Sequence, residues 1–311
     1  MKNRQTFSKL TLVIAAVIWG AGFIFTKYAL DSGFSVSGSL LGKFGIAAIV
    51  SGVAFRKSIR THMSRRVLKL GVPLGIALIA SFFAQTTGLA LSTPSNNALI
   101  TAAYVIIVPL MWRVVFRRKP APIVYFASIL CFVGVAALSV SFTGGISIGV
   151  GDLWTMLCAV LFAGQIVATE YIVREVDYKV LLFVQFTVAA IVSLVVFLVL
   201  DGGRETVLTL GGVGSIMYLG VLSTCVCYVM QTSAQRYVTS NTASMILSLE
   251  SLFGAAFSVM LGYDEPGLKL IIGGGLVMLA ILLPEVVEGI RAQKEVSGGK
   301  SALEIENEKT A

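Results

Sequence analysis

The chain has 311 residues, of which 56% are hydrophobic and only 13% are charged, with a mean hydropathy of +0.89. A soluble domain carries roughly 25% charged residues, so this chain could not cover a water-facing surface and is expected to lie in a lipid bilayer. The net charge of +8 does not indicate nucleic-acid binding, because the basic residues lie between apolar runs and are not interleaved with aromatic residues on polar segments.

Ten apolar runs follow one another, each close to the roughly 20 residues that a membrane-spanning helix needs. They cover residues 10–30, 37–55, 70–91, 97–116, 121–142, 152–173, 179–200, 211–232, 240–262 and 268–284. From about residue 285 the chain is polar and charged, so little fixed structure is expected there. The sequence therefore predicts an all-α polytopic membrane protein with ten transmembrane helices, followed by a charged cytoplasmic tail over residues 285–311.

The charged residues between these runs sort into two groups of loops. Lys and Arg lie before the first run and after the second, fourth, sixth and eighth, as in "RKSIRTHMSRRVLK" from Arg56 to Lys69. The other loops hold six acidic residues, namely Asp31, Asp152, Asp201, Glu205, Asp264 and Glu265, with Arg204 and Lys269 as their only basic residues. Because loops rich in Lys and Arg stay in the cytoplasm, both termini are predicted to be cytoplasmic, in a protein of the cell membrane.

Four short segments recur in the same order, at spacings between 142 and 146 residues. "KFGIAAIVS" at 43–51 returns as "QFTVAAIVS", "AGFI" at 21–24 as "AGQI", "QTTG" at 85–88 as "QTSA", and "SNNA" at 95–98 as "SNTA". Each copy, 10–142 and 152–284, contains five predicted helices. Because five is odd, the second copy is expected to be inverted in the membrane. Inverted repeats are common in secondary transporters, whose substrate site lies near the midplane between the copies.

Motifs for catalysis, metal binding or nucleotide binding do not occur in the sequence. The single histidine, His62, lies in a basic loop, and no HExxH, GxSxG or P-loop pattern is present. The cysteines have no metal-ligand spacing and are expected to pack as small apolar side chains; they are Cys131, Cys158, Cys225 and Cys227. We therefore expect neither an enzyme nor a cofactor or metal.

Glu250 is the most unusual residue of the apolar runs. A charge at the bilayer centre is costly, so such a residue is expected to face a cavity or a partner. On a regular helix, the small residues of the seam that includes Ser244, Ser248 and Ser251 would allow close packing, and the stripe from Met245 to Met260 would face lipid. Glu250 lies between the two, as a candidate for binding a substrate amine or carrying a coupling proton. The alternative is a structural role, with Lys43 or neighbouring hydroxyls as its partner.

Two lysines are further candidates. Lys43 lies inside the second run, and its counterpart in the second copy is Gln185. It is expected to serve either as a structural partner between helices or as a contact for an anionic substrate group. Lys27 lies near the outer end of the first run, where it can extend to the interface or contact substrate. Glu170, near the cytoplasmic end of the sixth run, is expected to extend to the interface in the same way.

Matched polar residues and several aromatic residues complete the candidates. Gln85 and Gln231 occupy equivalent positions in the two copies, which favours cavity lining, with hydrogen bonding between helices as the alternative. Trp19, Tyr104 and Phe257 could stack on a substrate, and their alternative is packing between helices.

The motifs resemble those of the EamA-type family of the drug/metabolite transporter superfamily. "WGAGFIFTK" from Trp19 to Lys27 resembles its first helix, and "ALITAAYVIIVP", ending at Pro109, its fourth. "SLESLFGAAFSVMLG" and the following "GLKLIIGGGLVMLAIL" are similar to its ninth and tenth helices. The resemblance implies ten helices, a central cavity between two bundles, and transport of small organic molecules.

We therefore expect a secondary transporter that moves a small organic metabolite by alternating access, with protons as a candidate coupling ion. An amino acid or an amphipathic compound is the substrate class considered. The alternative is a membrane channel or sensor without coupled transport. The apolar character of the runs and the short loops favour the transporter.

Overall fold

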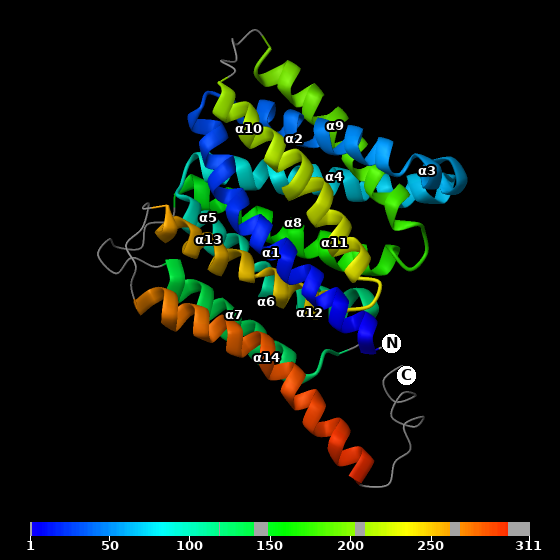
Figure 1. Cartoon of the computed structure of the whole chain (residues 1–311), viewed down its shortest axis with the longest axis vertical. Coiled ribbons are helices and arrows are strands. Elements are labelled where there is room, and N and C mark those ends of the chain that lie inside the picture. Colours follow the sequence, from blue (N-terminus) through cyan, green and yellow to red (C-terminus); the bar gives the residue numbers. More distant parts are fainter. Residues whose placement is uncertain (1, 118, 140–148, 203–208, 262–267, 298–311) are drawn as a thin grey trace.

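The computed structural model describes residues 2–117, 119–139, 149–202, 209–261 and 268–297, and these residues are helical with no strand among them (Figure 1). The first half of the chain contains α1 (Lys2–Asp31), α2 (Val36–Ala54), α3 (Arg56–His62), α4 (Arg65–Ala90), α5 (Pro94–Thr101), α6 (Tyr104–Phe116) and α7 (Pro122–Ser139). The second half contains α8 (Val150–Ile172), α9 (Tyr178–Leu200), α10 (Leu210–Tyr218), the π-helix η1 (Leu219–Val226), α11 (Cys227–Ala234), α12 (Ser240–Leu247), α13 (Leu249–Met260) and α14 (Leu268–Ser297).

Seven helical segments in the described part of the chain are long and apolar enough to cross a membrane. They are Arg4–Asp31, Val36–Ala54, Arg65–Ala90, Asn97–Phe116, Val150–Ile172, Tyr178–Leu200 and Leu210–Ala234. The other three predicted spans are also helical, but two are represented by the shorter apolar helices Pro122–Ala137 and Ile271–Pro284. The third, 240–262, is divided between α12 and α13. The structure thus confirms a helical protein of membrane type, in which seven of the ten predicted spans are long enough to cross a membrane.

Two of the predicted spans are interrupted at equivalent positions of the repeat. A turn at residues 102–103 separates α5 from α6, and Ser248 separates α12 from α13. These breaks are 145 residues apart, which is the spacing between "SNNA" and "SNTA". At each break a backbone N–H donates a hydrogen bond to the carbonyl oxygen three residues earlier. These bonds run from Ala103 N to Ile100 O (3.1 Å) and from Ser251 N to Ser248 O (3.1 Å). Neither break contains Gly or Pro, so the sequence carries no local signal for it.

The last helix is longer than predicted. We expected little fixed structure from residue 285, but α14 continues through Pro284 to Ser297. A proline interrupts one backbone hydrogen bond of a helix without necessarily ending it. The rest of the predicted tail, residues 298–311, lies outside the described residues.

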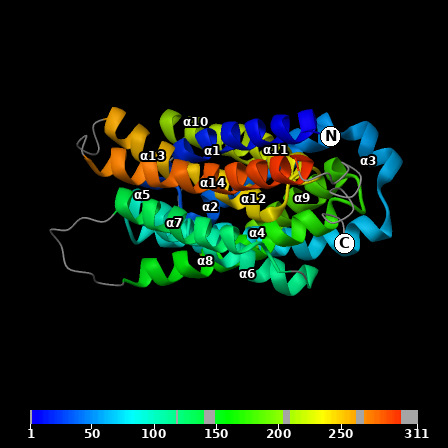
Figure 2. The ribbon, with the colours of Figure 1, turned by 90° about the horizontal axis from the view of Figure 1, so that it is seen from below.

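The described loops gather at two ends of the bundle with opposite charge. At one end, which we call the basic end, Arg66 contacts Glu175 at 2.5 Å, and the guanidinium of Arg4 lies 5.8 Å from the ring centre of Tyr237. The N-terminus and α3 lie together at this end, on the right of Figures 1 and 2. At the opposite, acidic end, Asp201 accepts a hydrogen bond from Ser35 at 2.8 Å. Loops that alternate along the chain therefore meet at opposite ends, as the charge pattern predicts.

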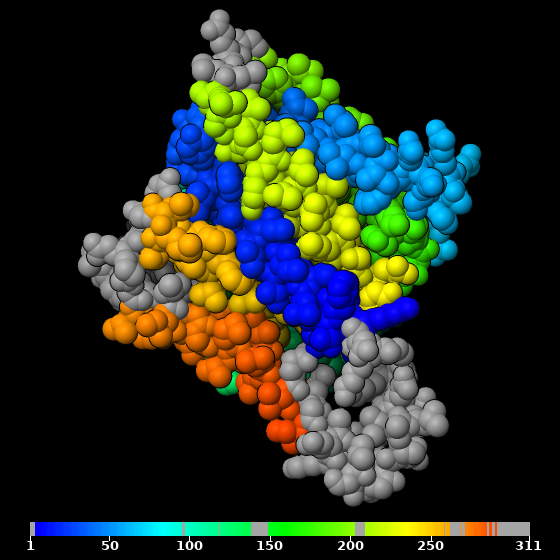
Figure 3. Space-filling model, in the orientation of Figure 1, coloured from blue at the N-terminus to red at the C-terminus, as the bar shows by residue number. Residues whose placement is uncertain are grey.

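Contacts between helices recur between their counterparts in the two copies. α1 packs against α10, α11 and α13, and its counterpart α8 packs against α4 and α6; Figure 3 shows α1 lying between α13 and α10–α11. Two glycines, Gly75 and Gly220, make the same kind of close backbone contact in the two copies. A Cβ atom added at Gly75 would lie 3.0 Å from the carbonyl oxygen of Gln185, and one at Gly220 would lie 3.1 Å from that of Lys43. Gln185 and Lys43 are themselves counterparts, so both copies bring the same backbones into close approach.

Candidate functional site

A cavity of about 60 Å³ lies inside the helix bundle, with room for a few water molecules. Its walls come from helices of both copies, and most of the lining is apolar or aromatic. The lining residues are Trp19, Gly22, Phe23, Thr26, Lys43, Phe82, Gln85, Thr86, Leu89, Tyr104, Phe162, Gln165, Ile166, Ser223, Tyr228, Gln231, Leu247 and Glu250. An apolar cavity with a few convergent polar groups is the usual form of a small-molecule site.

The two helix breaks bring Tyr104 and Glu250 together in this cavity. Tyr104 is the first residue of α6, and Glu250 is the second residue of α13. Both side chains are buried, and the Tyr104 hydroxyl donates a hydrogen bond to Glu250 Oε1 at 3.3 Å. Ser251 also ties the two regions, because its hydroxyl donates to the Ala98 carbonyl of α5 at 3.2 Å. The interrupted helices thus place one carboxylate at the centre of the bundle.

Lys43 supplies the cavity with a cation. Its side chain is only 6% exposed, and its Nζ lies 3.5 Å from the ring centre of Phe82 and 5.8 Å from that of Phe44. A cation over an aromatic face is attracted by the negative charge density of the ring. Lys43 and Glu250 line the same cavity but form no ion pair with each other, so the Lys43 contact considered as an alternative for Glu250 is absent from this structure.

Aromatic side chains form the apolar part of the wall around these charges. Phe82 packs edge-to-face with Phe162 at a ring-centre distance of 5.0 Å, and Tyr228 packs in the same way with Trp19 at 5.4 Å. The Trp19 Nε1–H donates to the Ser223 carbonyl of η1 at 2.6 Å. Single π-helical turns within helices are frequent at functional sites, and this one presents a carbonyl group to the cavity wall.

The cavity also contains three buried or half-buried amides. Gln85 Nε2 donates to Thr101 Oγ1 at 3.5 Å, and Gln231 Nε2 donates to Gln235 Oε1 at 3.3 Å. Gln165 Nε2 donates to Gln185 at 3.5 Å, while its Oε1 has no hydrogen-bond partner in the structure. A buried acceptor without a partner is costly, so a ligand that donates a hydrogen bond would stabilise this side of the cavity.

Comparison with known proteins identifies the family. A profile of the EamA-like transporter family matches residues 6–140 and again residues 149–284. The chain belongs to the EamA-like transporter family. An uncharacterised transporter of Archaeoglobus fulgidus is 28% identical over 286 residues, which cover 90% of this chain and 86% of that protein. A solved crystal structure has the same fold, with a TM-score of 0.74 at 15% identity, covering 90% of this chain and 96% of the other.

Six of the eight candidate residues of this EamA-like protein line the cavity: Trp19, Lys43, Gln85, Tyr104, Gln231 and Glu250. Lys27 and Phe257 lie elsewhere. Lys27 pairs with Asp31 at 2.6 Å at the acidic end, where its side chain is 37% exposed. Phe257 lies on α13, partly buried and away from the cavity lining.

Two expectations for residues near the site were wrong. Glu170 does not extend to the interface, because it is 1% exposed and accepts hydrogen bonds from three other residues. Met245 and Leu249, expected to face lipid, are each only 4% exposed. The break at Ser248 interrupts the regular 100° step on which the predicted stripe depended. The four cysteines are buried, as predicted.

Several lining residues were absent from the candidates, although the repeat holds a signal for them. Phe82 precedes Gln85 by three residues, and Tyr228 precedes Gln231 by three. Aromatic and amide side chains at this spacing share one helix face. Gln165 occupies the position in "AGQI" that Phe23 occupies in "AGFI", and both line the cavity. Pairing every position with its counterpart would have found these residues.

Proposed function

We propose that this protein is a secondary transporter that moves a small organic metabolite across the cell membrane by alternating access. The ten helices form two inverted five-helix repeats, and both termini lie in the cytoplasm. Support comes from the two family matches, from the counterpart contacts of α1 and α8, and from the helix breaks at equivalent positions. Broken helices at matching positions of two repeats are typical of transporter binding sites.

The observation that carries the substrate proposal is the presence of Lys43 and Glu250 in one aromatic cavity without an ion pair between them. Each buried charge gains from an opposite charge on a ligand. A zwitterion with an apolar body, such as an amino acid, would place a carboxylate near Lys43 and an amine near Glu250. Glu250 is also the residue in a position to carry a coupling proton when no amine is bound.

The size of the cavity supports alternating access. About 60 Å³ holds a few water molecules, whereas ligand pockets usually enclose about 300–1,000 Å³. The helices must therefore separate for a metabolite to enter or leave.

The proposed orientation predicts opposite labelling of the two ends. Thr61 lies on α3 at the basic end, and Ser32 lies in the turn after α1 at the acidic end. A membrane-impermeant maleimide applied to intact cells should label Ser32→Cys but label Thr61→Cys only after the cells are opened. The native cysteines are buried, so the unsubstituted protein measures the background. Labelling of Thr61→Cys in intact cells would reverse the proposed orientation.

A stabilisation assay tests the substrate class. A ligand at about 100 times its Kd stabilises the native state by roughly 2.7 kcal/mol, so a panel of amino acids and other small zwitterions should raise the melting temperature of the purified protein. Lys43→Gln introduces the residue that its counterpart position holds. This variant should no longer be stabilised by zwitterions. It should still be stabilised by amines that have the same apolar body as those zwitterions but no carboxylate.

Each outcome of the panel bears on one part of the proposal. Glu250→Gln should show the reverse selectivity, with loss of stabilisation by amines. Glu175→Gln makes the same chemical change in a surface ion pair with Arg66 and should respond to ligands as the unsubstituted protein does. Equal stabilisation of all three variants by zwitterions would contradict binding between Lys43 and Glu250.

A further inference from the structure

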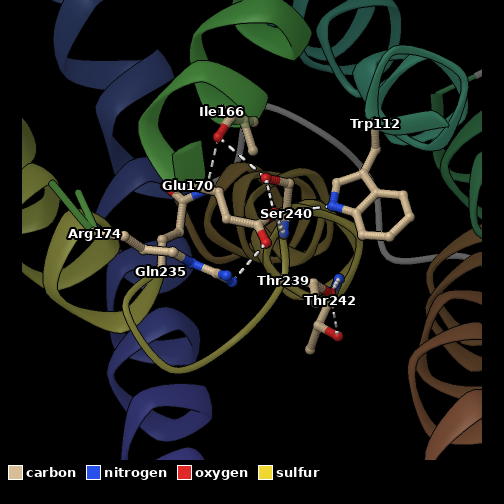
Figure 4. Close-up of polar contacts among 8 residues, drawn as sticks. All are labelled: Trp112, Ile166, Glu170, Arg174, Gln235, Thr239, Ser240 and Thr242. Carbon is tan, nitrogen blue, oxygen red and sulfur yellow. Dashed lines mark hydrogen bonds and ion pairs between the residues drawn. The ribbon is translucent and has the colours of Figure 1, made fainter. Parts of the chain in front are cut away.

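Ile166 connects the cavity lining to a group of hydrogen bonds nearer the basic end. Ile166 lines the cavity, and its carbonyl oxygen accepts hydrogen bonds from Gln235 Nε2 at 2.8 Å and from Ser240 Oγ at 3.2 Å (Figure 4). Gln235 follows α11, and Ser240 is the first residue of α12. These two side chains therefore connect separate helices beneath the cavity.

Glu170 lies one helical turn below Ile166 and collects four hydrogen bonds. Its Oε2 accepts from Ser240 N and Ser240 Oγ, both at 2.7 Å, and from Trp112 Nε1 at 3.1 Å. Its Oε1 accepts from Arg174 at 3.1 Å. Figure 4 shows the carboxylate enclosed between Arg174, Ser240 and Trp112. Hydrogen bonds to a charged group are the stronger kind, and a carboxylate at the N-terminus of α12 is further favoured by the helix dipole.

These bonds join elements that must separate if the cavity opens at the basic end. Trp112 belongs to α6 of the first copy, while Glu170 and Ser240 belong to α8 and α12 of the second. Glu170 is 1% exposed, and the donors around it replace the water that its charge would otherwise need. The network therefore joins α6, α8 and α12 between the cavity residue Ile166 and the basic end.

The first copy has no carboxylate at the position equivalent to Glu170. By the spacings of the repeat, the counterparts of Glu170, Ser240 and Trp112 are Tyr28, Ser95 and Phe257. Tyr28 is half exposed and Phe257 is partly buried. A tyrosine and a phenylalanine cannot bind a helix terminus as a carboxylate does. The Glu170 network therefore has no counterpart of the same composition in the first copy.

We propose that Glu170 is the gating residue of the basic end: its bonds to Ser240, Trp112 and Arg174 hold the cavity closed there and break when it opens to the cytoplasm. The proposal rests on the alternating-access function proposed above. Glu170 touches no substrate and acts by positioning α12 against α6 and α8. Removing its charge shifts the protein toward the state that is open at the basic end, because only the closed state contains these bonds.

Accessibility of a cavity cysteine tests this gate without any substrate. Thr86 lines the cavity from α4, far along the chain from the gate residues. In liposomes of known orientation, a membrane-impermeant maleimide should label Thr86→Cys slowly from the basic end. Adding Glu170→Gln should raise that rate at least about tenfold, the factor expected for one lost bond to a charged group, and should lower the rate from the acidic end.

Matched variants separate gating from general loosening of the bundle. Glu175→Gln removes a charge at the same end, from the surface pair with Arg66, and should change the labelling rates less than about twofold, since exposed pairs contribute little. Trp112→Phe and Ser240→Ala each remove part of the network and keep the carboxylate. Each should increase the labelling rate from the basic end by a smaller factor than Glu170→Gln. If Glu170→Gln does not fold, these two variants test the gate in its place.

Two results would overturn the gate. Unchanged labelling from the basic end in folded variants would show that the network does not close the path. An equal increase from both ends would show a purely structural role. Because no substrate enters the assay, a switch in accessibility without transport of any metabolite would leave the gate standing and reject the proposed function.

Discussion

Glu250→Gln is expected to yield a folded protein that reaches the membrane and transports its substrate at least about a hundredfold more slowly. The physical reason is the loss of the one carboxylate among the described residues that line the cavity. Removing one member of a buried charge contact costs about 2–5 kcal/mol, and about 2.8 kcal/mol corresponds to a factor of 100. Uptake or efflux in proteoliposomes, compared with the Glu175→Gln variant, measures the effect.

The same variant distinguishes the two roles proposed for Glu250. If the carboxylate binds a substrate amine, both net transport and exchange of substrate between the two sides should fall. If it carries a coupling proton, net transport should fall while exchange continues, because glutamine has the shape of a permanently neutral acid. Transport at the unsubstituted rate at every pH would reject both roles and leave Glu250 as a structural partner of Tyr104.

Gly20→Ala is expected to destabilise the protein, although alanine is a better helix former than glycine. A Cβ atom at Gly20 would lie 2.8 Å from the Glu250 carbonyl oxygen and 2.8 Å from the Gly254 backbone nitrogen. Backbone atoms cannot avoid the new Cβ atom by changing rotamer, as a side chain could, so α1 and α13 must move apart. Overpacking typically costs about 1–3 kcal/mol, which exceeds the gain of about 1 kcal/mol in helix propensity.

Gly45→Ala is the matched control, because a Cβ atom at Gly45 would meet nothing within 4 Å. Thermal unfolding should show Gly20→Ala melting about 5 °C lower than the unsubstituted protein and Gly45→Ala melting at the same temperature or higher. Gly20→Ala should also reduce transport, because it displaces the backbone of Glu250. Equal melting temperatures for the two variants would contradict the close approach of α1 and α13.

Hydropathy predicts the helices well because the membrane imposes the same requirement on every span. The runs 37–55, 70–91, 152–173 and 179–200 correspond closely to α2, α4, α8 and α9. The breaks before Tyr104 and Leu249 escaped prediction. No Gly or Pro marks them, and what stabilises an interrupted helix is contact with other helices, as between Ser251 and the Ala98 carbonyl.

Six cavity residues could be predicted, four of them as polar groups in apolar runs, which need a partner or a cavity, and Trp19 and Tyr104 as aromatic residues that could stack on a substrate. Two outcomes depended on packing that the sequence does not reveal. Glu170 was placed at the interface, whereas Ser240 and Trp112 surround it in the structure. Phe257 was a candidate for stacking on a substrate, with packing between helices as the alternative, and it lies outside the cavity lining. Both outcomes depend on how α8, α12 and α13 pack against other helices.

Composition, charge and internal repetition were sufficient to recognise a helical membrane protein of two related halves with one anomalous carboxylate. These features can be evaluated segment by segment, because the lipid bilayer imposes the same requirement on every span. Which polar groups meet is a different question, because Lys43, Tyr104 and Glu250 come from helices distant in sequence and converge only through packing. The absence of a Lys43–Glu250 ion pair, the aromatic contact of Lys43 with Phe82 and the enclosure of Glu170 therefore emerge from the folded bundle.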